Sequence, residues 1–262
     1  MLYRRLNDKL FTSADLTGTY AGCSLFVIGG NPVLSTLPLA ALESSRLLTL
    51  ALNNVPYTYP NPTMWLTADK PACYGGHFFA RPDIIKFGYM NYRDDVVAAT
   101  GKPLKEHPMM MFYTATPAVD ENCFFAQVPA FTWWKSVFPI SLQLAWRLGV
   151  RRVYLVGCSF LTNQEKPYAW AAKLDGFQTK WSQDTYNDDV SRLESLLPLF
   201  KENGFSVTSC TPYSKANKLL PYVDLRAAVN HELSLMPKPV PMGELRHSSD
   251  FRPKGDGDCG AH

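Results

Sequence analysis

The chain has 262 residues, of which 46% are hydrophobic, so it is long enough to bury one sizeable α/β core. Its formal net charge of +3 is close to balance, which argues against a dedicated nucleic-acid-binding protein, although a local basic patch stays open. No apolar run reaches the roughly 18 residues of a membrane-spanning helix, and residues 1–15 lack a secretory signal, so we expect a cytoplasmic protein.

The first half of the chain is dominated by short apolar runs, which are typical of buried strands. A short helix and a loop are expected within residues 2–20. Strands are then predicted at 23–29, 46–52, 63–69 and 83–88. Short helices are predicted at 36–43, where Thr36 can cap the first turn, and at 75–81.

Residues 91–131 carry possible strands at 109–113 and 123–127 among prolines and charges. We interpret this segment as an insertion or a mobile segment near the site. A buried helix is predicted at 134–148, and Gly149 ends it. Because Pro139 lies inside that span, the helix either begins late or kinks.

The second half continues with a strand at 151–157 and a long polar loop at 158–186. A helix at 189–203, which Asn187 or Asp188 would cap, and a last strand at 205–210 follow. Residues 237–262 are rich in Pro, Gly and charge and predict a flexible tail. A helix followed by glycine and an apolar strand is half of a βαβ unit. The prediction is therefore a single α/β, Rossmann-like nucleotide-binding domain over residues 1–236, with a mostly parallel central sheet, flanking helices, and a small insertion or lid.

Two predicted strands end abruptly in small or amide residues, Gly29-Gly30-Asn31 and Asn53-Asn54. In an open parallel sheet such strand ends meet at the carboxyl edge, where ligands bind. A glycine turn there lets backbone N–H groups approach an anion closely, because no Cβ intervenes. We predict that these strand ends hold a nucleotide phosphate or ribose. The alternative is that both are ordinary turns.

Other candidates lie at the predicted ends of strands and helices. Asp69 would orient a sugar hydroxyl or a metal, although an Asp before Lys-Pro is more often a turn former. Lys135 and Ser136 lie at a predicted helix N-terminus, which favours anions, and Lys135 adds charge for a phosphate leaving group. Several tryptophans, at 133, 134, 170 and 181, would stack a sugar or base, or pack in the core.

The cysteines and histidines do not indicate a metal site. Six cysteines are scattered and none forms C-x-x-C, and a disulfide framework is not expected in a chain of this size. His77, His107 and His231 have no metal-ligand spacing. A metal is therefore not expected to be required.

Three segments together resemble the bacterial sialyltransferases that use CMP-sialic acid, and equally the 6-hydroxymethylpterin pyrophosphokinase-like proteins. The first is Val27–Leu34 with Asn53. The family has at this point a strand followed by Gly-x-Gly-Pro-Ser-Leu and then a second strand that ends in Asn. The second is Lys135–Phe160 with Tyr168-Ala169-Trp170, where the family has a helix, a strand followed by Gly-x-Asp-Phe, and then Tyr-Ala-Phe. The third is the helix at 189–203 leading to 207–214.

This resemblance implies that Gly157 and Ser159 also line the donor site and that the Tyr168 phenol contacts the leaving phosphate. The sequence departs from the family at several positions. Asn31 replaces a Gly, Val33 a Ser and Ser159 an Asp, and residues 181–187 lack the family's general-base His. The base is then Asp184, Asp188 or a group from elsewhere.

The leading functional hypothesis is an inverting, nucleotide-sugar-dependent glycosyltransferase with a CMP- or UDP-type donor. Its acceptor carries a hydroxyl, on a glycan or on a phage-type modified DNA base, so a nucleic acid would be only a substrate. One alternative is a Mg²⁺-dependent pyrophosphokinase acting on a pterin-like alcohol, which needs a carboxylate pair. The other is a catalytically inactive nucleotide-binding module.

Overall fold

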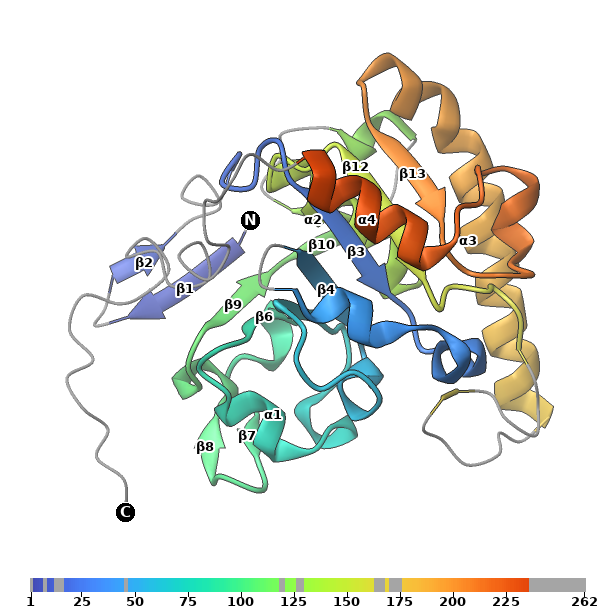
Figure 1. Ribbon diagram of the computed structural model, residues 1–262. Helices are drawn as coiled ribbons and strands as arrows, with labels where there is room; N and C mark the ends of the chain where they lie inside the picture. The colour runs from blue at the N-terminus through green and yellow to red at the C-terminus, as the bar shows by residue number, and fades with distance from the viewer. Residues whose placement is uncertain are drawn as a thin grey trace.

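The computed structural model describes residues 2–6, 9–11, 17–44, 47–117, 121–125, 130–162, 168–169 and 176–235. Its centre is a sheet with the strand order β13-β12-β3-β4-β5-β6-β9-β1-β2 (Figure 1). The seven strands from β13 to β9 run parallel, and β1 and β2 close one edge in antiparallel pairing. The chain therefore has an α/β, Rossmann-like fold, as the sequence predicts.

The parallel strands lie close to the predicted positions. In chain order they are β3 Ser24–Ile28, β4 Leu48–Leu52, β5 Met64–Leu66, β6 Ile85–Tyr89, β9 Met110–Tyr113, β12 Arg152–Val156 and β13 Ser206–Ser209. The edge strands are β1 Leu2–Leu6 and β2 Lys9–Phe11. Two small pairs lie outside the main sheet, namely β7 Val96–Val97 with β8 Lys102–Pro103 and β10 Ala115–Pro117 with β11 Phe131–Trp133.

Helices cover both faces of the sheet. The α-helices are α1 Gly76–Ala80, α2 Val137–Arg147, α3 Gly176–Glu202 and α4 Leu225–Leu235. Short 3-10 helices make many of the connections: η2 Pro32–Thr36, η3 Leu39–Glu43, η4 Val55–Tyr57, η5 Pro71–Cys73, η6 Met90–Tyr92, η7 Leu104–Glu106, η8 Glu121–Phe124 and η9 Lys215–Lys218. Figure 1 shows α4 in front of β3 and the long α3 at one side.

The strand side chains divide between two apolar clusters because successive residues of a strand point to opposite faces. Leu25 and Val27 of β3 pack in the cluster that contains the buried residues of α2 and α3. Phe26 and Ile28 pack in the cluster that contains those of α1 and α4. The sheet is thus buried on both faces, which explains why its strands read as continuous apolar runs.

The order of the strands creates a topological switch point between β3 and β12. From β3 the chain continues through β4, β5, β6 and β9 in one direction, and it then returns to place β12 on the other side of β3. In open α/β sheets, ligands bind beside the carboxyl ends of the strands at such a point. The turns that follow β3 and β12 contain Gly29 and Gly157.

Two predictions for the N-terminal region are wrong. Residues 2–6 and 9–11 are strands rather than a helix, because β1 completes the sheet by pairing with β9. The expected helix at 36–43 is instead the two 3-10 helices η2 and η3, and Pro38 lies between them. Pro38 has no N–H to donate, so a continuous helix would lose a backbone hydrogen bond there.

The segment predicted as an insertion contributes a strand to the main sheet, because β9 pairs with β6 and β1. The expected strand at 123–127 is wrong, since residues 121–124 form η8. Of the two alternatives for Pro139, a late helix start or a kink, the structure shows the late start. Because α2 begins at Val137, Pro139 falls in the first turn, where its missing N–H costs nothing. Gly149, with φ 88°, follows the helix as expected.

The long loop predicted at 158–186 is wrong in its second part. α3 begins at Gly176, so residues 176–186 are helical and neither Asn187 nor Asp188 is the cap. The predicted tail at 237–262 lies outside the described residues.

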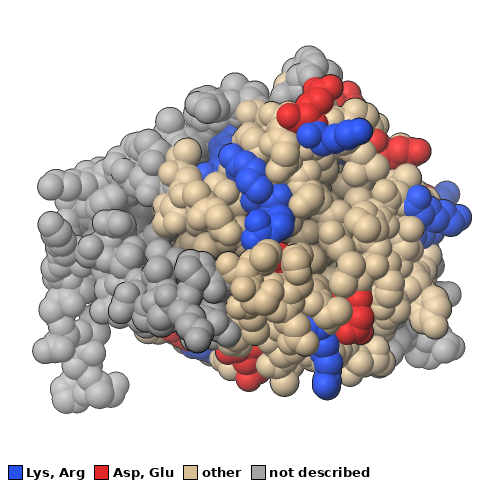
Figure 2. Space-filling model, turned by 45° about the horizontal axis from the view of Figure 1, so that its top comes forward, with Lys and Arg blue, Asp and Glu red and all other residues tan. Residues whose placement is uncertain are grey.

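Charged side chains are mixed over the surface that Figure 2 shows. The Lys and Arg residues of the described chain form one short group on that face and otherwise stand apart, with acidic residues near them. The described part of that face therefore offers no extended basic surface of the kind that binds a nucleic-acid backbone.

Candidate functional site

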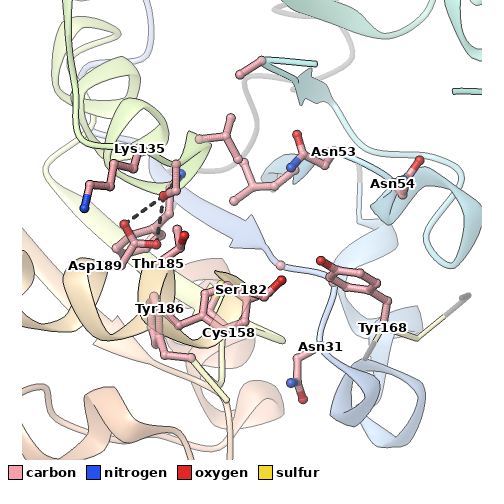
Figure 3. Close-up of a pocket in the computed structure, with 18 of the residues that line it drawn as sticks. Asn31, Asn53, Asn54, Lys135, Cys158, Tyr168, Ser182, Thr185, Tyr186 and Asp189 are labelled. Atoms are coloured by element: carbon pink, nitrogen blue, oxygen red, sulfur yellow. Dashed lines mark hydrogen bonds between the residues drawn. The ribbon is translucent and has the colours of Figure 1, made fainter. Parts of the chain in front are cut away.

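A cavity of about 530 Å³ opens at the carboxyl ends of the central strands (Figure 3). This volume lies within the usual range of small-molecule sites, roughly 300–1,000 Å³. All predicted site residues except Asp184 and Asp188 line it, namely Gly29, Gly30, Asn31, Asn53, Asn54, Asp69, Lys135, Ser136, Gly157, Ser159 and Tyr168. The structure therefore brings together residues that are up to 139 positions apart in the sequence (Gly29 to Tyr168).

The floor of the cavity is formed by backbone of the switch point. A Cβ at Gly29 would lie 2.7 Å from Cys158 Sγ and 2.8 Å from the Gly157 carbonyl oxygen. A Cβ at Gly157, whose φ is +66°, would lie 2.6 Å from the Gly29 carbonyl oxygen. Neither position has room for a side chain. Both glycines are thus required by the contact between the two turns, whatever ligand lies above them.

Asn31 has an ordinary backbone conformation, with φ −65°, and caps η2. Its Oδ1 accepts a hydrogen bond from the Val33 N–H at 3.1 Å, and its Nδ2 donates to the Leu161 carbonyl at 3.1 Å. Asn31 therefore does not adopt the left-handed conformation that a glycine at this position in the family could adopt. The side chain of Asn31 holds the turn above β3 against the turn above β12.

Asn53 does adopt a left-handed conformation, with φ 47°, at the end of β4. Its N–H donates to the Leu66 carbonyl at 3.0 Å, and its carbonyl accepts from Trp65 Nε1 at 2.7 Å. The Tyr74 hydroxyl lies 3.3 Å from Asn53 Oδ1. The amide is thereby fixed on the wall of the cavity.

Asp69 belongs to the same network, since the Tyr74 hydroxyl donates to its Oδ2 at 2.8 Å. The Asp69 N–H donates to Thr67 Oγ1 at 3.1 Å, which is the turn-forming geometry. Burial is the main cause that raises the pKa of Tyr74, so the phenol stays protonated and able to donate. Tyr74 was not predicted, and it joins the ends of β4 and β5.

Asn54 and Ser159 are held in turns on opposite sides of the floor. Asn54 precedes η4, and its buried Oδ1 has no hydrogen-bond partner among the described residues. The Ser159 hydroxyl accepts from the Leu161 N–H at 3.1 Å.

Lys135 lies at the rim of the cavity, immediately before α2. Its Nζ is 2.6 Å from Asp188 Oδ2, and the two side chains are 71% and 52% exposed. Such an exposed pair contributes little to stability, on the order of 0–1 kcal/mol. The ammonium group is therefore available to an anionic ligand at low cost.

Ser136 caps α2, as its predicted place at the helix N-terminus requires, and contacts a carboxylate that was not predicted. Its Oγ accepts from the Phe138 N–H at 3.2 Å and lies 2.8 Å from both Oδ1 and Oδ2 of Asp189. Asp189 is 2% exposed and lines the cavity. Burial raises the pKa of its carboxyl to about 7, while the hydrogen bond from Ser136 acts in the opposite direction.

The face of α3 that lines the cavity follows helical spacing. Ser182, Thr185, Tyr186 and Asp189 are at positions i, i+3, i+4 and i+7 and share this face. Asp184 and Asp188 are exposed on another face of the same helix. Had α3 been extended to its true start, this spacing would have identified Asp189 from the sequence.

Tyr168 lines the side of the cavity opposite Lys135 and Asp189 in Figure 3. The neighbouring Ala169 N–H donates to the Gly30 carbonyl at 3.0 Å, so Tyr168 is tied to the turn above β3. Tyr186 hydrogen-bonds to Tyr168, and burial is the main cause that raises the pKa of Tyr186. Trp170, the next aromatic residue of the predicted motif, lies outside the described residues.

Backbone strain gathers at this cavity. Five non-glycine residues in the described ranges have a left-handed φ, and three of them, Asn53, Lys135 and Phe160, line the cavity. Each such residue costs about 1–3 kcal/mol and persists only where the surrounding contacts impose it. Strain of this kind is typical of functional sites.

Within the ranges that the structure describes, no three His, Cys, Asp or Glu side chains converge as metal ligands would. Among the described helices, none has the length and the hydrophobicity needed to cross a membrane. No protein-family model matches the chain, and no curated protein sequence matches it.

Solved structures of similar fold include glycosyltransferases. The MAf glycosyltransferase from Magnetospirillum magneticum AMB-1 aligns with 91% of this chain at 13% identity and a TM-score of 0.48. This chain spans only 40% of that protein. The sialyltransferase CstII from Campylobacter jejuni, in complex with cytidine-5'-monophosphate, aligns with 77% of this chain and 85% of its own, at 14% identity and a TM-score of 0.46.

A mammalian sialyltransferase in complex with Gal-beta-1-3GalNAc-ortho-nitrophenol aligns with 71% of this chain and 68% of its own, at 12% identity and a TM-score of 0.35. All three TM-scores are below 0.5.

Proposed function

We propose that this chain is a glycosyltransferase, which transfers a sugar from a nucleotide-sugar to a hydroxyl-bearing acceptor. The observation that carries the proposal is one cavity at the β3/β12 switch point, in which polar strand ends face the N-terminus of α2. This is where an open α/β sheet binds nucleotides. The resemblance of the sequence to sialyltransferases supports the same chemistry.

The lining residues suit the parts of such a donor. Asn53 and Asn54 offer amide groups to a ribose or base, and Trp133 and Phe160 offer apolar surface. Lys135 and the α2 N-terminus favour an anionic leaving group. Among the described lining residues Lys135 is the single cation, which fits a donor with one phosphate, such as a CMP-sugar, better than a diphosphate.

The acceptor stays as predicted from the sequence, a hydroxyl on a glycan or on a modified DNA base. Transfer requires that negative charge on the departing phosphate be stabilised and that the acceptor hydroxyl lose its proton. Lys135 and Tyr168 are proposed for the first task. The same experiment also tests the pyrophosphokinase alternative.

The proposal is tested by thermal shift with CMP-, UDP- and GDP-sugars and with ATP, each with and without Mg²⁺. Metal-free stabilisation by a nucleotide-sugar supports the transferase, whereas stabilisation by ATP that requires Mg²⁺ supports the pyrophosphokinase. Nucleotide binding without turnover over a broad acceptor panel supports the inactive module. Absence of any nucleotide-dependent shift contradicts the proposed site.

Two substitutions locate the ligand. We expect Asn53→Ala to weaken nucleotide binding roughly tenfold, because it removes one hydrogen bond to the ligand, worth about 1.4 kcal/mol. Gly30→Val places a side chain in the turn and should also weaken binding. Asn203→Ala, at the exposed end of α3, is the matched control and should bind as the wild type does. Unchanged affinity in both site variants would remove the site.

A further inference from the structure

Asp189 is a buried carboxylate with unusually few hydrogen-bond donors. Only 2% of the residue is exposed, yet Ser136 Oγ is its single donor among the described residues. One hydroxyl hydrogen is therefore shared between two carboxylate oxygens. A buried carboxylate whose charge serves only the fold normally has several donors or a cationic partner.

The position of Asp189 explains the missing partners. The residue lines the cavity, and Figure 3 shows its carboxylate beside Lys135 and Thr185, across the cavity from Asn53 and Tyr168. The dashed contacts in that view both lead to Ser136, at the start of α2. The oxygen lone pairs that Ser136 does not occupy are open to a molecule in the cavity.

The titratable groups around Asp189 do not neutralise it. Cys158, in the turn after β12, and Tyr186, three residues before Asp189 in α3, both have pKa values raised mainly by burial, so both are neutral near pH 7. Asp188 adds negative charge and further raises the pKa of Asp189. The ammonium group of Lys135 pairs with Asp188 instead.

We propose that Asp189 is the proton acceptor of the transfer reaction, taking the hydrogen of the acceptor hydroxyl. This assignment rests on the proposed function. It places the base on α3 and inside the cavity, next to the α2 N-terminus where the departing phosphate would be held. Asp184 and Asp188, which the sequence suggests, are exposed and do not line the cavity.

The step balances without a further reactant. The acceptor oxygen forms a bond to the anomeric carbon of the sugar while its proton passes to Asp189. The bond between the anomeric carbon and the phosphate oxygen breaks, and its electron pair leaves with the nucleotide. Asp189 then releases the proton to water. A base whose pKa is near the working pH is best matched to this task, and burial brings the Asp189 pKa to about 7.

The test compares Asp189→Asn with the wild type in two separate assays, nucleotide binding by thermal shift and sugar transfer by product formation. Asparagine keeps the shape and an oxygen that Ser136 can contact, but it cannot accept the proton. We expect binding within threefold of the wild type and transfer lowered at least 100-fold, the usual range for loss of a general base. Glu194→Gln, an exposed change on the same helix, is the control and should retain both.

The pH profile separates a base from a structural residue. Transfer by the wild type should rise with pH and level off above about 7. Ser136→Ala removes the one donor that favours the charged carboxylate, so the rise should move to higher pH.

The named outcomes are decisive. The assignment is overturned if Asp189→Asn transfers the sugar at the full rate. It is also overturned if the increase of the transfer rate with pH disappears in Asp188→Asn or Asp184→Asn instead. Either result leaves the donor site intact. Failure of the wild type to bind any nucleotide overturns the proposed function and this assignment with it.

Discussion

Glu232 and Asp189 are both buried carboxylates, and their surroundings differ completely. Glu232 of α4 is 0% exposed and receives two hydrogen bonds from Arg152, at 3.0 and 2.9 Å, and one from the Tyr154 hydroxyl at 2.7 Å. Asp189 of α3 receives one shared hydrogen from Ser136. The first carboxylate is surrounded by the chain, whereas the second faces a cavity.

The two pKa values are displaced in opposite directions. Burial acts to raise the pKa of Glu232, but the hydrogen bonds from Arg152 and Tyr154 outweigh it and leave the pKa below its ordinary value. Burial dominates at Asp189 and raises its pKa. The number of donors therefore distinguishes a carboxylate that joins α4 to the sheet from one that is suited to move a proton.

The largest effect is expected from Glu232→Gln. The change leaves Arg152 without its ionic partner, and the position of the glutamate side chain is fully buried. We therefore expect a loss of about 2–3 kcal/mol in the free energy of unfolding. The lowered pKa means that this stabilisation is present above the unfolded-state value of 4.5 and is lost as the pH falls further. Urea unfolding at pH 7 and pH 4 measures the loss of stability and its dependence on pH. A loss that is the same at the two pH values would show that the charge is not responsible.

Asp189→Asn should act in the opposite direction. A carboxyl whose pKa is about 7 in the fold and 3.8 as its reference value stabilises the fold below pH 3.8, and this contribution is lost as the pH rises through 7. The difference corresponds to an upper bound of roughly 4 kcal/mol. We expect the variant to be more stable than the wild type by about 1–2 kcal/mol at pH 8. The gain stays below the upper bound because the buried N–H donors of the new amide also need hydrogen-bond acceptors.

The measurement is urea unfolding of wild type and variant from pH 4 to pH 8. The gap between the two stabilities should widen up to about pH 7 and then stay constant. A gap that does not depend on pH would mean that Asp189 ionises normally. It would also remove the contrast with Glu232.

The smallest effect on stability is expected from Lys135→Ala. Its ion pair with Asp188 is largely exposed, so the free energy of unfolding should change by less than about 0.5 kcal/mol. Nucleotide affinity should nevertheless fall severalfold if the ammonium group contacts the phosphate. Thermal shift with and without nucleotide separates the two effects, and an unchanged affinity would restrict Lys135 to its contact with Asp188.

The strand-end residues that line the cavity can be predicted from the sequence because their signals are local. Gly29 and Asn53 follow apolar runs directly, and their positions depend on the backbone turn that each strand must make. Gly157 is assigned only through the family resemblance. The helical side depends on contacts between segments far apart in sequence. Ser136 is recognisable as a cap, but its contact with Asp189 joins residues 53 positions apart.

Elements that depend on distant contacts are the ones that the sequence predicts wrongly. The edge strands β1 and β2 exist because β9 offers an unpaired edge, which no local pattern reveals. The polar outward face of the stretch before residue 189 predicts a loop, whereas α3 extends back to Gly176. Asp189, which we propose as the general base, is therefore expected from the sequence at the start of a helix, whereas it lies in the middle of α3.

The glycine contact at the switch point restricts how this cavity can diversify. Gly29 and Gly157 touch through main-chain atoms alone, so no substitution there can add a contact to a ligand without separating the two strands. Altered preference for a donor or an acceptor must then arise in the surrounding walls, above all along α3. An engineered library aimed at new sugars should randomise Ser182, Thr185 and Tyr186 and leave the base of the cavity untouched.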